Sequence, residues 1–115
     1  QVSNYGVISS KNIDGIEKVD GIVEKPKPAD APSNLAVFGR YILSKDIFLN
    51  IEQTKPGLNN EIQLTDAIQD LISNQDVFAL EFEGRRFDCG SKEGYISAII
   101  DRALSIDKYK SIIEK

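Results

Sequence analysis

Residues 60–72 read Asn60-Glu61-Ile62-Gln63-Leu64-Thr65-Asp66-Ala67-Ile68-Gln69-Asp70-Leu71-Ile72 and hold the most regular apolar pattern of the chain. Apolar side chains recur there at positions i, i+3, i+4, i+7 and i+8, beginning at Leu64. This spacing puts them on one face and predicts an amphipathic helix. Thr65 and Asp66 fall in or near its first turn, where an acid suits the helix dipole. A helix start is their first interpretation, and contact with a ligand is the alternative.

Three strands are predicted before this helix. Residues 5–9 form a short β-rich run, and residues 19–25 form a second strand that Pro26 stops. Residues 35–43 are apolar apart from Arg40, a pattern typical of a strand buried on both faces. Between this run and residue 60, Ser44 can cap a short helix whose apolar face comprises Ile47, Phe48 and Ile51.

Strands and helices also follow the helix of residues 64–72. Residues 77–83 alternate and predict a half-buried strand with Phe78, Leu80 and Phe82 on its buried face. Residues 86–88 predict another short strand. A second strong helix follows Ser91, and Asp107 begins a last short one. The apolar stripe of the second strong helix is formed by Ile96, Ile99, Ile100, Ala103 and Leu104.

The resulting order, β, β, β, α, α, β, β, α, α, favours an α/β fold with a sheet covered by helices. The chain contains no Met and begins close to a predicted strand. We therefore expect a piece of a longer protein, in which the sheet begins before residue 1 and two strands are left as bare edges; the alternative is a natural small domain processed at its start. We expect residues 1–90 to form part of the α/β core and residues 91–115 to form C-terminal helices.

Composition excludes several classes of function. The 115 residues carry a net charge of −4, and an acidic chain without a basic block is a poor candidate for binding nucleic acid or an anionic membrane. The chain has no His, which removes Ser-His-Asp and Cys-His catalysis and every His-containing zinc site. Its one Cys, Cys89, cannot form an internal disulfide, so a reducing compartment, the cytoplasm, is expected. The aromatic side chains are interpreted mostly as core.

Two charged segments at predicted strand ends are candidates for chemistry. At Glu24-Lys25-Pro26, the carboxylate can accept two sugar hydroxyls and the ammonium can bind a phosphate; the alternative is a solvated charge pair. At Asp88-Cys89-Gly90-Ser91-Lys92, an Asp followed by a Gly suits a hard cation such as Mg²⁺; the alternative is a turn before a capped helix. Gly6 lets a ligand approach the backbone closely, or marks a bulge.

Six phrases in order make the chain resemble the C-terminal part of the bacterial UTP–glucose-1-phosphate uridylyltransferases (UDP-glucose pyrophosphorylases), nearly throughout its length. The phrases are Tyr5-Gly6-Val7-Ile8, Gly21-Ile22-Val23-Glu24-Lys25-Pro26, Ala31-Pro32-Ser33-Asn34-Leu35-Ala36, Gly39-Arg40-Tyr41, Asn60-Glu61-Ile62-Gln63-Leu64-Thr65-Asp66-Ala67-Ile68 and Asp88-Cys89-Gly90. The resemblance implies a Rossmann-like nucleotidyltransferase fold with a mixed sheet and C-terminal helices. It implies the formation of UDP-glucose and pyrophosphate from UTP and glucose 1-phosphate with Mg²⁺.

The resemblance also implies roles for individual residues. Glu24 would hold glucose hydroxyls and Lys25 the sugar phosphate, while Gly6 and Val37 would line the sugar through their backbones. Asp88 matches the second metal-binding aspartate of related thymidylyltransferases, so Lys25 and Asp88 are the expected catalytic residues. The full-length enzyme is expected to be a homo-oligomer.

One departure from the family is large, because its Gly-rich nucleotide loop and first metal-binding Asp have no counterpart in these residues. We therefore expect this chain alone not to turn over. The alternatives are a related pyrophosphorylase with another base or sugar, and a non-catalytic module whose helices from residue 91 onward pair two subunits. Asp-Cys-Gly at residues 88–90, where thymidylyltransferases usually carry Asp-Thr-Gly, favours the uridylyl branch.

Overall fold

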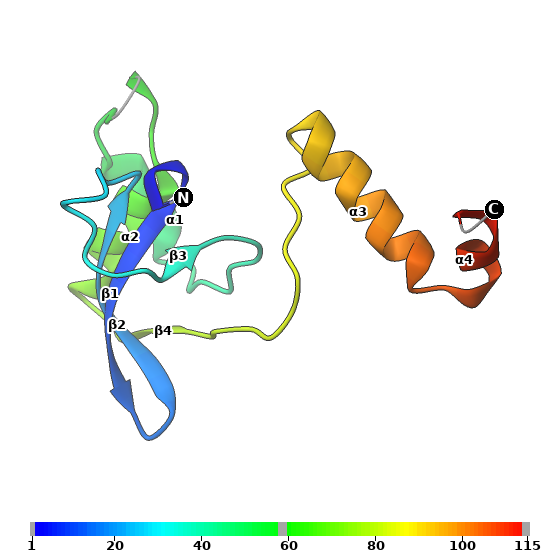
Figure 1. Cartoon of the computed structure of the whole chain (residues 1–115). Coiled ribbons are helices and arrows are strands. Elements are labelled where there is room, and N and C mark those ends of the chain that lie inside the picture. Colours follow the sequence, from blue (N-terminus) through cyan, green and yellow to red (C-terminus); the bar gives the residue numbers. More distant parts are fainter. Residues whose placement is uncertain (1, 58–59, 114–115) are drawn as a thin grey trace. The chain divides into compact units, whose positions relative to one another are not determined.

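The computed structural model describes residues 2–57 and 60–113, and the chain divides into two compact units, Gln1–Glu81 and Phe82–Lys115 (Figure 1). The first unit contains a four-stranded sheet with two helices, and the second contains two helices. The elements of the first unit are η1 (Val2–Asn4), β1 (Gly6–Ile13), β2 (Ile16–Glu24), β3 (Ala36–Val37), α1 (Ile47–Gln53), α2 (Leu64–Ile72) and β4 (Val77–Ala79). Those of the second are α3 (Lys92–Leu104) and α4 (Asp107–Ile113).

The sheet is built on the β1–β2 hairpin, and its strand order is β3-β1-β2-β4. Asp14 and Gly15 form the two-residue turn with φ angles of 53° and 87°, the conformation for which Asp-Gly is favoured in hairpins. Both strands are longer at their turn ends than predicted, and the hairpin projects beyond α1 and α2 (Figure 1). The three pairings among the described strands are all antiparallel, so they do not include the parallel pair of a mixed sheet.

A β-bulge shifts the pairing inside the hairpin. Ser9 lies opposite Gly21 and Ser10 lies opposite Val19, which leaves Asp20 as the extra residue of β2. Because of this extra residue, Val19 and Ile22 are three positions apart and yet both belong to the core. The backbone N–H of Ile22 donates to Oε1 of Gln69 on α2 at 2.8 Å, so the helix side chain satisfies a donor beside the bulge.

Helix α2 confirms the prediction made from its periodicity. It runs from Leu64 to Ile72, and Ala67, Ile68 and Leu71 are buried. They form one cluster with Ile8, Val19 and Ile22 of the sheet and Ile47 of α1. The core of the first unit therefore lies between one face of the hairpin and the two helices.

The predicted strand over residues 35–43 is wrong beyond its first residues. Only Ala36–Val37 form β3, paired with Val7 and Gly6 of β1. Gly39 then adopts a φ of 91°, which interrupts an extended strand, and Tyr41 and Ile42 are exposed. The apolar composition was that of a buried strand, but β3 is an edge strand with β1 on one side only, and residues 38–43 pair with no strand among the described residues.

Residues 77–83 also pair over a shorter length than predicted. Strand β4 ends at Ala79, and its inward side chains are Val77 and Ala79, which pack against the core. The side chains predicted to face inward are exposed: Phe78, Leu80 and Phe82. The alternation was correct in period and wrong in phase. Residues 86–88 form no strand.

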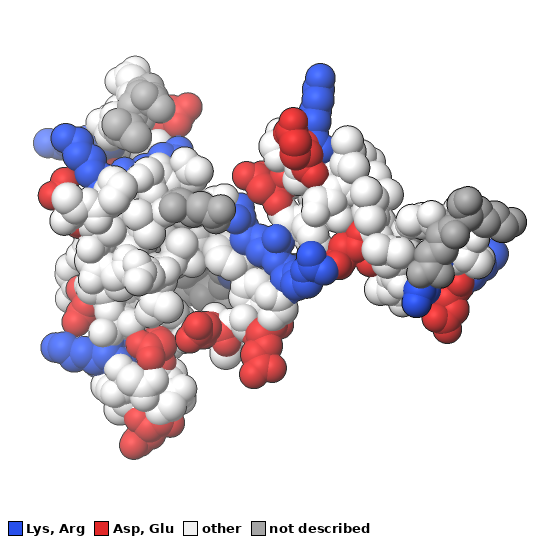
Figure 2. All heavy atoms as spheres, in the orientation of Figure 1, with Lys and Arg blue, Asp and Glu red and all other residues white. Residues whose placement is uncertain are grey.

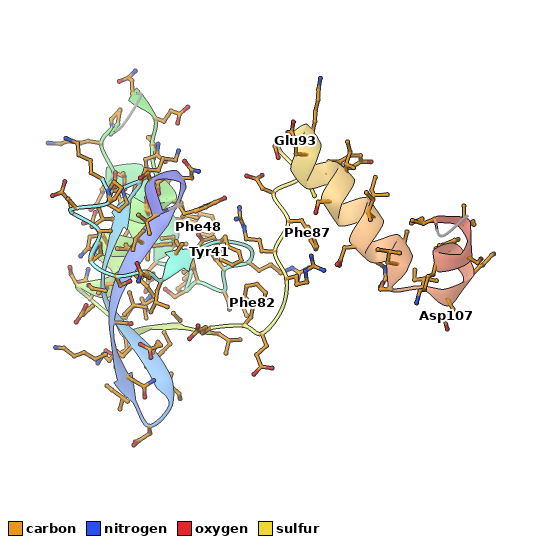
Figure 3. The ribbon with its side chains drawn as sticks, in the orientation of Figure 1. Tyr41, Phe48, Phe82, Phe87, Glu93 and Asp107 are labelled. Carbon is orange, nitrogen blue, oxygen red and sulfur yellow. The ribbon has the colours of Figure 1, made fainter. Side chains whose placement is uncertain are left out.

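The cap of the first helix lies elsewhere than predicted. Helix α1 begins at Ile47 with Asp46 at its N-cap, and no side chain caps it. Ser44 instead accepts a hydrogen bond at its Oγ from Nε2 of Gln75 at 2.8 Å. The Oγ of Ser44 is therefore used in a long-range contact. Ile47 is buried as predicted, whereas Phe48 is exposed (Figure 3).

The second unit confirms both predicted helices. Ser91 caps α3, because its Oγ accepts the N–H of Gly94 at 3.0 Å. Asp107 is the first residue of α4. The apolar stripe of α3 is largely exposed in this chain, including Ile96, Ile99, Ile100 and Leu104. Among the described residues, no helix is both long enough and apolar enough to cross a membrane.

Candidate functional site

The end of β2 brings Glu24 against the first turn of α2. Strand residues alternate between faces, so Glu24 shares the face of buried Ile22, which α2 covers. Thr65, in the first turn of α2, donates from Oγ1 to Oε2 of Glu24 at 3.0 Å. The carboxylate is therefore held by a hydroxyl from an element 41 residues away in the sequence. Its side chain retains 16% exposure, so one part of it remains open to solvent.

Lys25 turns the chain out of β2 beside this carboxylate. Its Nζ lies 3.6 Å from Oε1 of Glu24, and 38% of its side chain is exposed. Its backbone has a φ of 44°, an uncommon conformation for a non-glycine residue, and its N–H donates to the carbonyl of Tyr5 at 3.0 Å. Strained backbone of this kind costs about 1–3 kcal/mol and clusters at ligand sites. The exposed ammonium and the held carboxylate together form a charged pair with one open side.

Gly6 lies directly opposite Glu24 in the sheet and opposite Val37 on its other side. A Cβ added to Gly6 would lie 2.8 Å from Cγ2 of Thr65, 2.9 Å from Cγ2 of Val37 and 3.4 Å from Oε2 of Glu24. Only glycine fits at this point. The absence of a side chain at Gly6 therefore lets the Glu24 carboxylate pack close to the Gly6 backbone.

Four of the five sequence-predicted site residues are thus brought together in the first unit: Gly6, Glu24, Lys25 and Val37. They converge from β1, the end of β2 and β3. Tyr41, on the segment after β3, is labelled in Figure 3, and its phenol is affected by the charge of Glu24. Burial raises the pKa of its phenol above the usual value, and the negative charge of Glu24 adds to that shift.

Asp88, the fifth predicted site residue, belongs to the second unit. Its Oδ1 accepts the N–H of Gly90 at 3.1 Å, and its Oδ2 lies 3.9 Å from the guanidinium of Arg86. Its side chain is 60% exposed. Within residues 2–57 and 60–113, no three His, Cys, Asp or Glu side chains gather as a metal site. Mg²⁺ uses one or two carboxylates beside phosphates, so the Asp88 carboxylate is chemically compatible with such a site without a larger cluster.

The sequence carries a family signature over most of its length. The family whose pattern matches is described as Nucleotidyl transferase, and the match covers residues 1–103. The chain belongs to the nucleotidyl transferase family.

Individual nucleotidyl transferases are similar to this chain at high identity. It is 50% identical over 111 residues to the UTP–glucose-1-phosphate uridylyltransferase 2 of Streptococcus pyogenes serotype M1, across 95% of this chain and 37% of that protein. It is 56% identical over 99 residues to the UTP–glucose-1-phosphate uridylyltransferase of Pseudomonas aeruginosa, across 85% of this chain and 36% of that protein. The chain thus spans little more than a third of the length of these curated relatives.

Solved structures agree with this assignment. A crystal structure of UDP-glucose pyrophosphorylase complexed with UDP-glucose matches with a TM-score of 0.84 and 49% identity, over 91% of this chain and 40% of that one. A UTP-bound UGPase from Acinetobacter baumannii matches with a TM-score of 0.77 and 40% identity, over 99% of this chain and 41% of that one. The expected nucleotidyltransferase fold of α/β class is confirmed.

Two residues beside Glu24 were not predicted as members of the candidate site. Thr65 was predicted at a helix start, with contact to a ligand as the alternative, and its contact with Glu24 joins two segments whose spatial relation no local pattern reveals. Tyr41 was interpreted as core, but it is partly exposed beside Glu24. The structure buries Thr65 at 7% exposure. The sequence signal for this burial was the position of a β-branched polar residue beside the apolar positions of an amphipathic helix.

Proposed function

We propose that this chain supplies the sugar-phosphate site of a UTP–glucose-1-phosphate uridylyltransferase, a magnesium-dependent cytoplasmic enzyme with a Rossmann-like core that acts as a homo-oligomer. The reaction joins glucose 1-phosphate to the uridylyl group of UTP and releases pyrophosphate. One observation carries the proposal: the carboxylate of Glu24, held by Thr65 and flanked by the Lys25 ammonium, lies over the bare backbone of Gly6. The similarity to UTP–glucose-1-phosphate uridylyltransferases supports the choice of substrates.

Each residue has a task that suits its chemistry. The Glu24 carboxylate accepts hydrogen bonds from sugar hydroxyls, and the Lys25 ammonium offsets the charge of the sugar phosphate. Gly6 and Val37 border the sugar through their backbones, and at residue 6 a side chain larger than glycine does not fit. Acidic and basic side chains are interspersed over the first unit in the view of Figure 2, which shows no broad basic face on that side.

No general base is required for this reaction. The nucleophile is a phosphate oxygen whose second pKa is about 6, so it is ionised at neutral pH. The absence of His from the chain is therefore compatible with the chemistry. The remaining task is to bring two polyanions into line and to reduce their repulsion. Asp88 would hold Mg²⁺, which when bound neutralises phosphate charge.

The test is the sugar dependence of the complete enzyme that contains this segment. A hydrogen bond to a charged group contributes about 1.5–3 kcal/mol, so Glu24→Ala is expected to lower kcat/KM for glucose 1-phosphate at least about tenfold. Glu17→Gln is a matched control, because Glu17 lies near the turn end of the same strand. Unchanged kcat/KM for glucose 1-phosphate in Glu24→Ala would remove Glu24 from the site and refute the proposal.

One observation favours a second role for the second unit. The exposed apolar residues of α3 suit a module that pairs subunits, independent of the sugar site. Sedimentation of the complete protein across a concentration series tests this role. A strict monomer at all concentrations contradicts it, whereas a monomer–dimer equilibrium that Ile99→Glu shifts toward monomer supports it.

A further inference from the structure

The Thr65–Glu24 hydrogen bond is unusual for its combination of burial and position. Thr65 is the one polar residue buried among the described residues, at 7% exposure. Its hydroxyl donates to Oε2 of Glu24, while the other oxygen, Oε1, is the one near Lys25. The two oxygens of the carboxylate therefore have different partners. One is fixed by a helix, and the other faces the exposed ammonium.

This arrangement fixes the direction of the carboxylate. A Glu side chain has three rotatable bonds, and ordering it costs conformational entropy. A hydrogen bond from a helix whose inner face is packed in the core holds the group before any ligand arrives. A carboxylate has about four lone-pair sites, so one bond from Thr65 leaves acceptor sites for two hydroxyl groups.

We propose that Thr65 is a positioning residue for sugar recognition: its hydroxyl holds the Glu24 carboxylate in the orientation that accepts vicinal hydroxyls of a hexose phosphate. The inference rests on the proposed function, because it assigns a task to a residue behind the same site. Thr65 itself acts through Glu24. Its methyl group has a separate task, which is to pack against Gly6. Cγ2 of Thr65 lies 2.8 Å from the point that a Cβ of residue 6 would occupy.

The competing interpretation is that the bond only attaches α2 to the end of β2. The two interpretations differ in what the loss of the hydroxyl changes. A purely structural bond would lower stability and affect both substrates alike. A positioning bond raises KM for the sugar phosphate, leaves KM for UTP unchanged, and has no effect on sugar use once the carboxylate is removed.

The experiment uses the complete enzyme with four variants at this pair. Thr65→Val removes the hydroxyl and keeps a branched side chain, and Thr65→Ser keeps the hydroxyl and removes the methyl. Glu24→Ala and the double variant Glu24→Ala/Thr65→Val complete the cycle. Thr54→Val is the matched control, because Thr54 also donates its hydroxyl, to the carbonyl of Asn50 at 2.8 Å in α1. Thr65→Ala replaces Thr65→Val if the valine variant does not fold.

We expect Thr65→Val to lower kcat/KM for glucose 1-phosphate about tenfold through KM, with KM for UTP changed less than about twofold. Thr65→Ser is expected to restore most of the loss, and the valine change is expected to have almost no effect in the Glu24→Ala background. Equal losses for both substrates, no rescue by serine, or no loss at all would overturn the inference while leaving the role of Glu24 intact. If Glu24→Ala itself has no effect, the proposed function fails at its own test and this inference falls with it.

Discussion

Replacing Gly6 by alanine tests the packing beneath the Glu24 carboxylate. The added methyl group would meet Cγ2 of Thr65 at 2.8 Å and Cγ2 of Val37 at 2.9 Å. Both neighbours are β-branched, so the χ1 angle of each is restricted and leaves it little freedom to turn away. Thr65 is additionally fixed by its hydrogen bond to Glu24. The methyl group therefore has no flexible side chain to displace.

The expected loss follows from these two contacts. Overpacking by one methyl group in a well-packed region costs about 1–3 kcal/mol. Alanine at a compatible strand position would instead stabilise by about 0.4–1 kcal/mol, through the smaller entropy of the unfolded chain. We therefore expect Gly6→Ala to lower the free energy of unfolding by about 1–2 kcal/mol in urea denaturation.

Gly21 provides the matched control for this measurement. Neither Gly6 nor Gly21 has a positive φ, and a Cβ at Gly21 would meet only two side-chain atoms, Oγ of Ser9 at 2.8 Å and Oε1 of Gln69 at 3.6 Å. The Ser9 hydroxyl can rotate away, so Gly21→Ala is expected to be neutral within about 0.5 kcal/mol. If Gly6→Ala were as stable as wild type and bound glucose 1-phosphate equally well in the complete enzyme, the close packing of Thr65 and Val37 on Gly6 would be refuted.

Three further predictions concern the first unit. The raised pKa of Tyr41 means that the folded state keeps the phenolic proton to higher pH than the unfolded chain. The contribution of this group to stability is therefore complete below pH 10 and is lost as pH rises through the folded pKa; the difference in urea stability between wild type and Tyr41→Phe from pH 9 to 12 measures it. Hydrogen bonds from Ser10 and then Asn12 lower the pKa of Glu17, so Ser10→Ala is expected to move it back toward 4.5 in an NMR titration, and an unmoved value would contradict the 2.6 Å contact. Gly15→Ala is expected to cost about 1 kcal/mol in thermal unfolding, because its φ of 87° is unfavourable for alanine, and a neutral result would argue against this turn.

The helices could be predicted because the required information is local. Leu64, Ala67, Ile68 and Leu71 specify a face by spacing alone, and the structure buries three of them. Ser91 satisfies a first-turn N–H in its own helix, so its role as a cap was also visible in the sequence. Ser44 had the same local signal, but its hydroxyl oxygen accepts a hydrogen bond from Gln75 instead. A partner 31 residues away cannot be inferred from a local sequence pattern.

The strands were less predictable because a strand requires a partner. Residues 35–43 have the composition of a buried strand, but pairing depends on what lies alongside, and Gly39 bends the chain after two paired residues. In residues 77–83 the period of two was visible, whereas the face that meets the core depends on the register with β2. Val77 pairs with Val19 and packs inward, which reverses the face inferred from Phe78.

The site was predictable in part for the same reason. Glu24 and Lys25 are adjacent in sequence and follow a strand, so the charged pair could be recognised, and the family resemblance gave it a meaning. The grouping of Gly6 with Glu24 and Val37 follows from strand register rather than from any one segment. Thr65 completes the group through the packing of α2 on the hairpin, which only the three-dimensional structure reveals.

The extra residue at Asp20 divides the hairpin into an inner arm, residues 6–9 paired with 21–24, and a projecting arm, residues 10–13 paired with 16–19. A ladder continued from the turn without this interruption would put Val23 opposite Gly6 and would turn Glu24 away from α2. The bulge can absorb the gain or loss of one residue near Asp20, while the pairs from Gly6↔Glu24 to Ser9↔Gly21 keep their register and their faces. The projecting arm can therefore change in length during evolution without moving Glu24. An insertion between Ile22 and Glu24 would instead put the Glu24 carboxylate on the opposite face of the sheet.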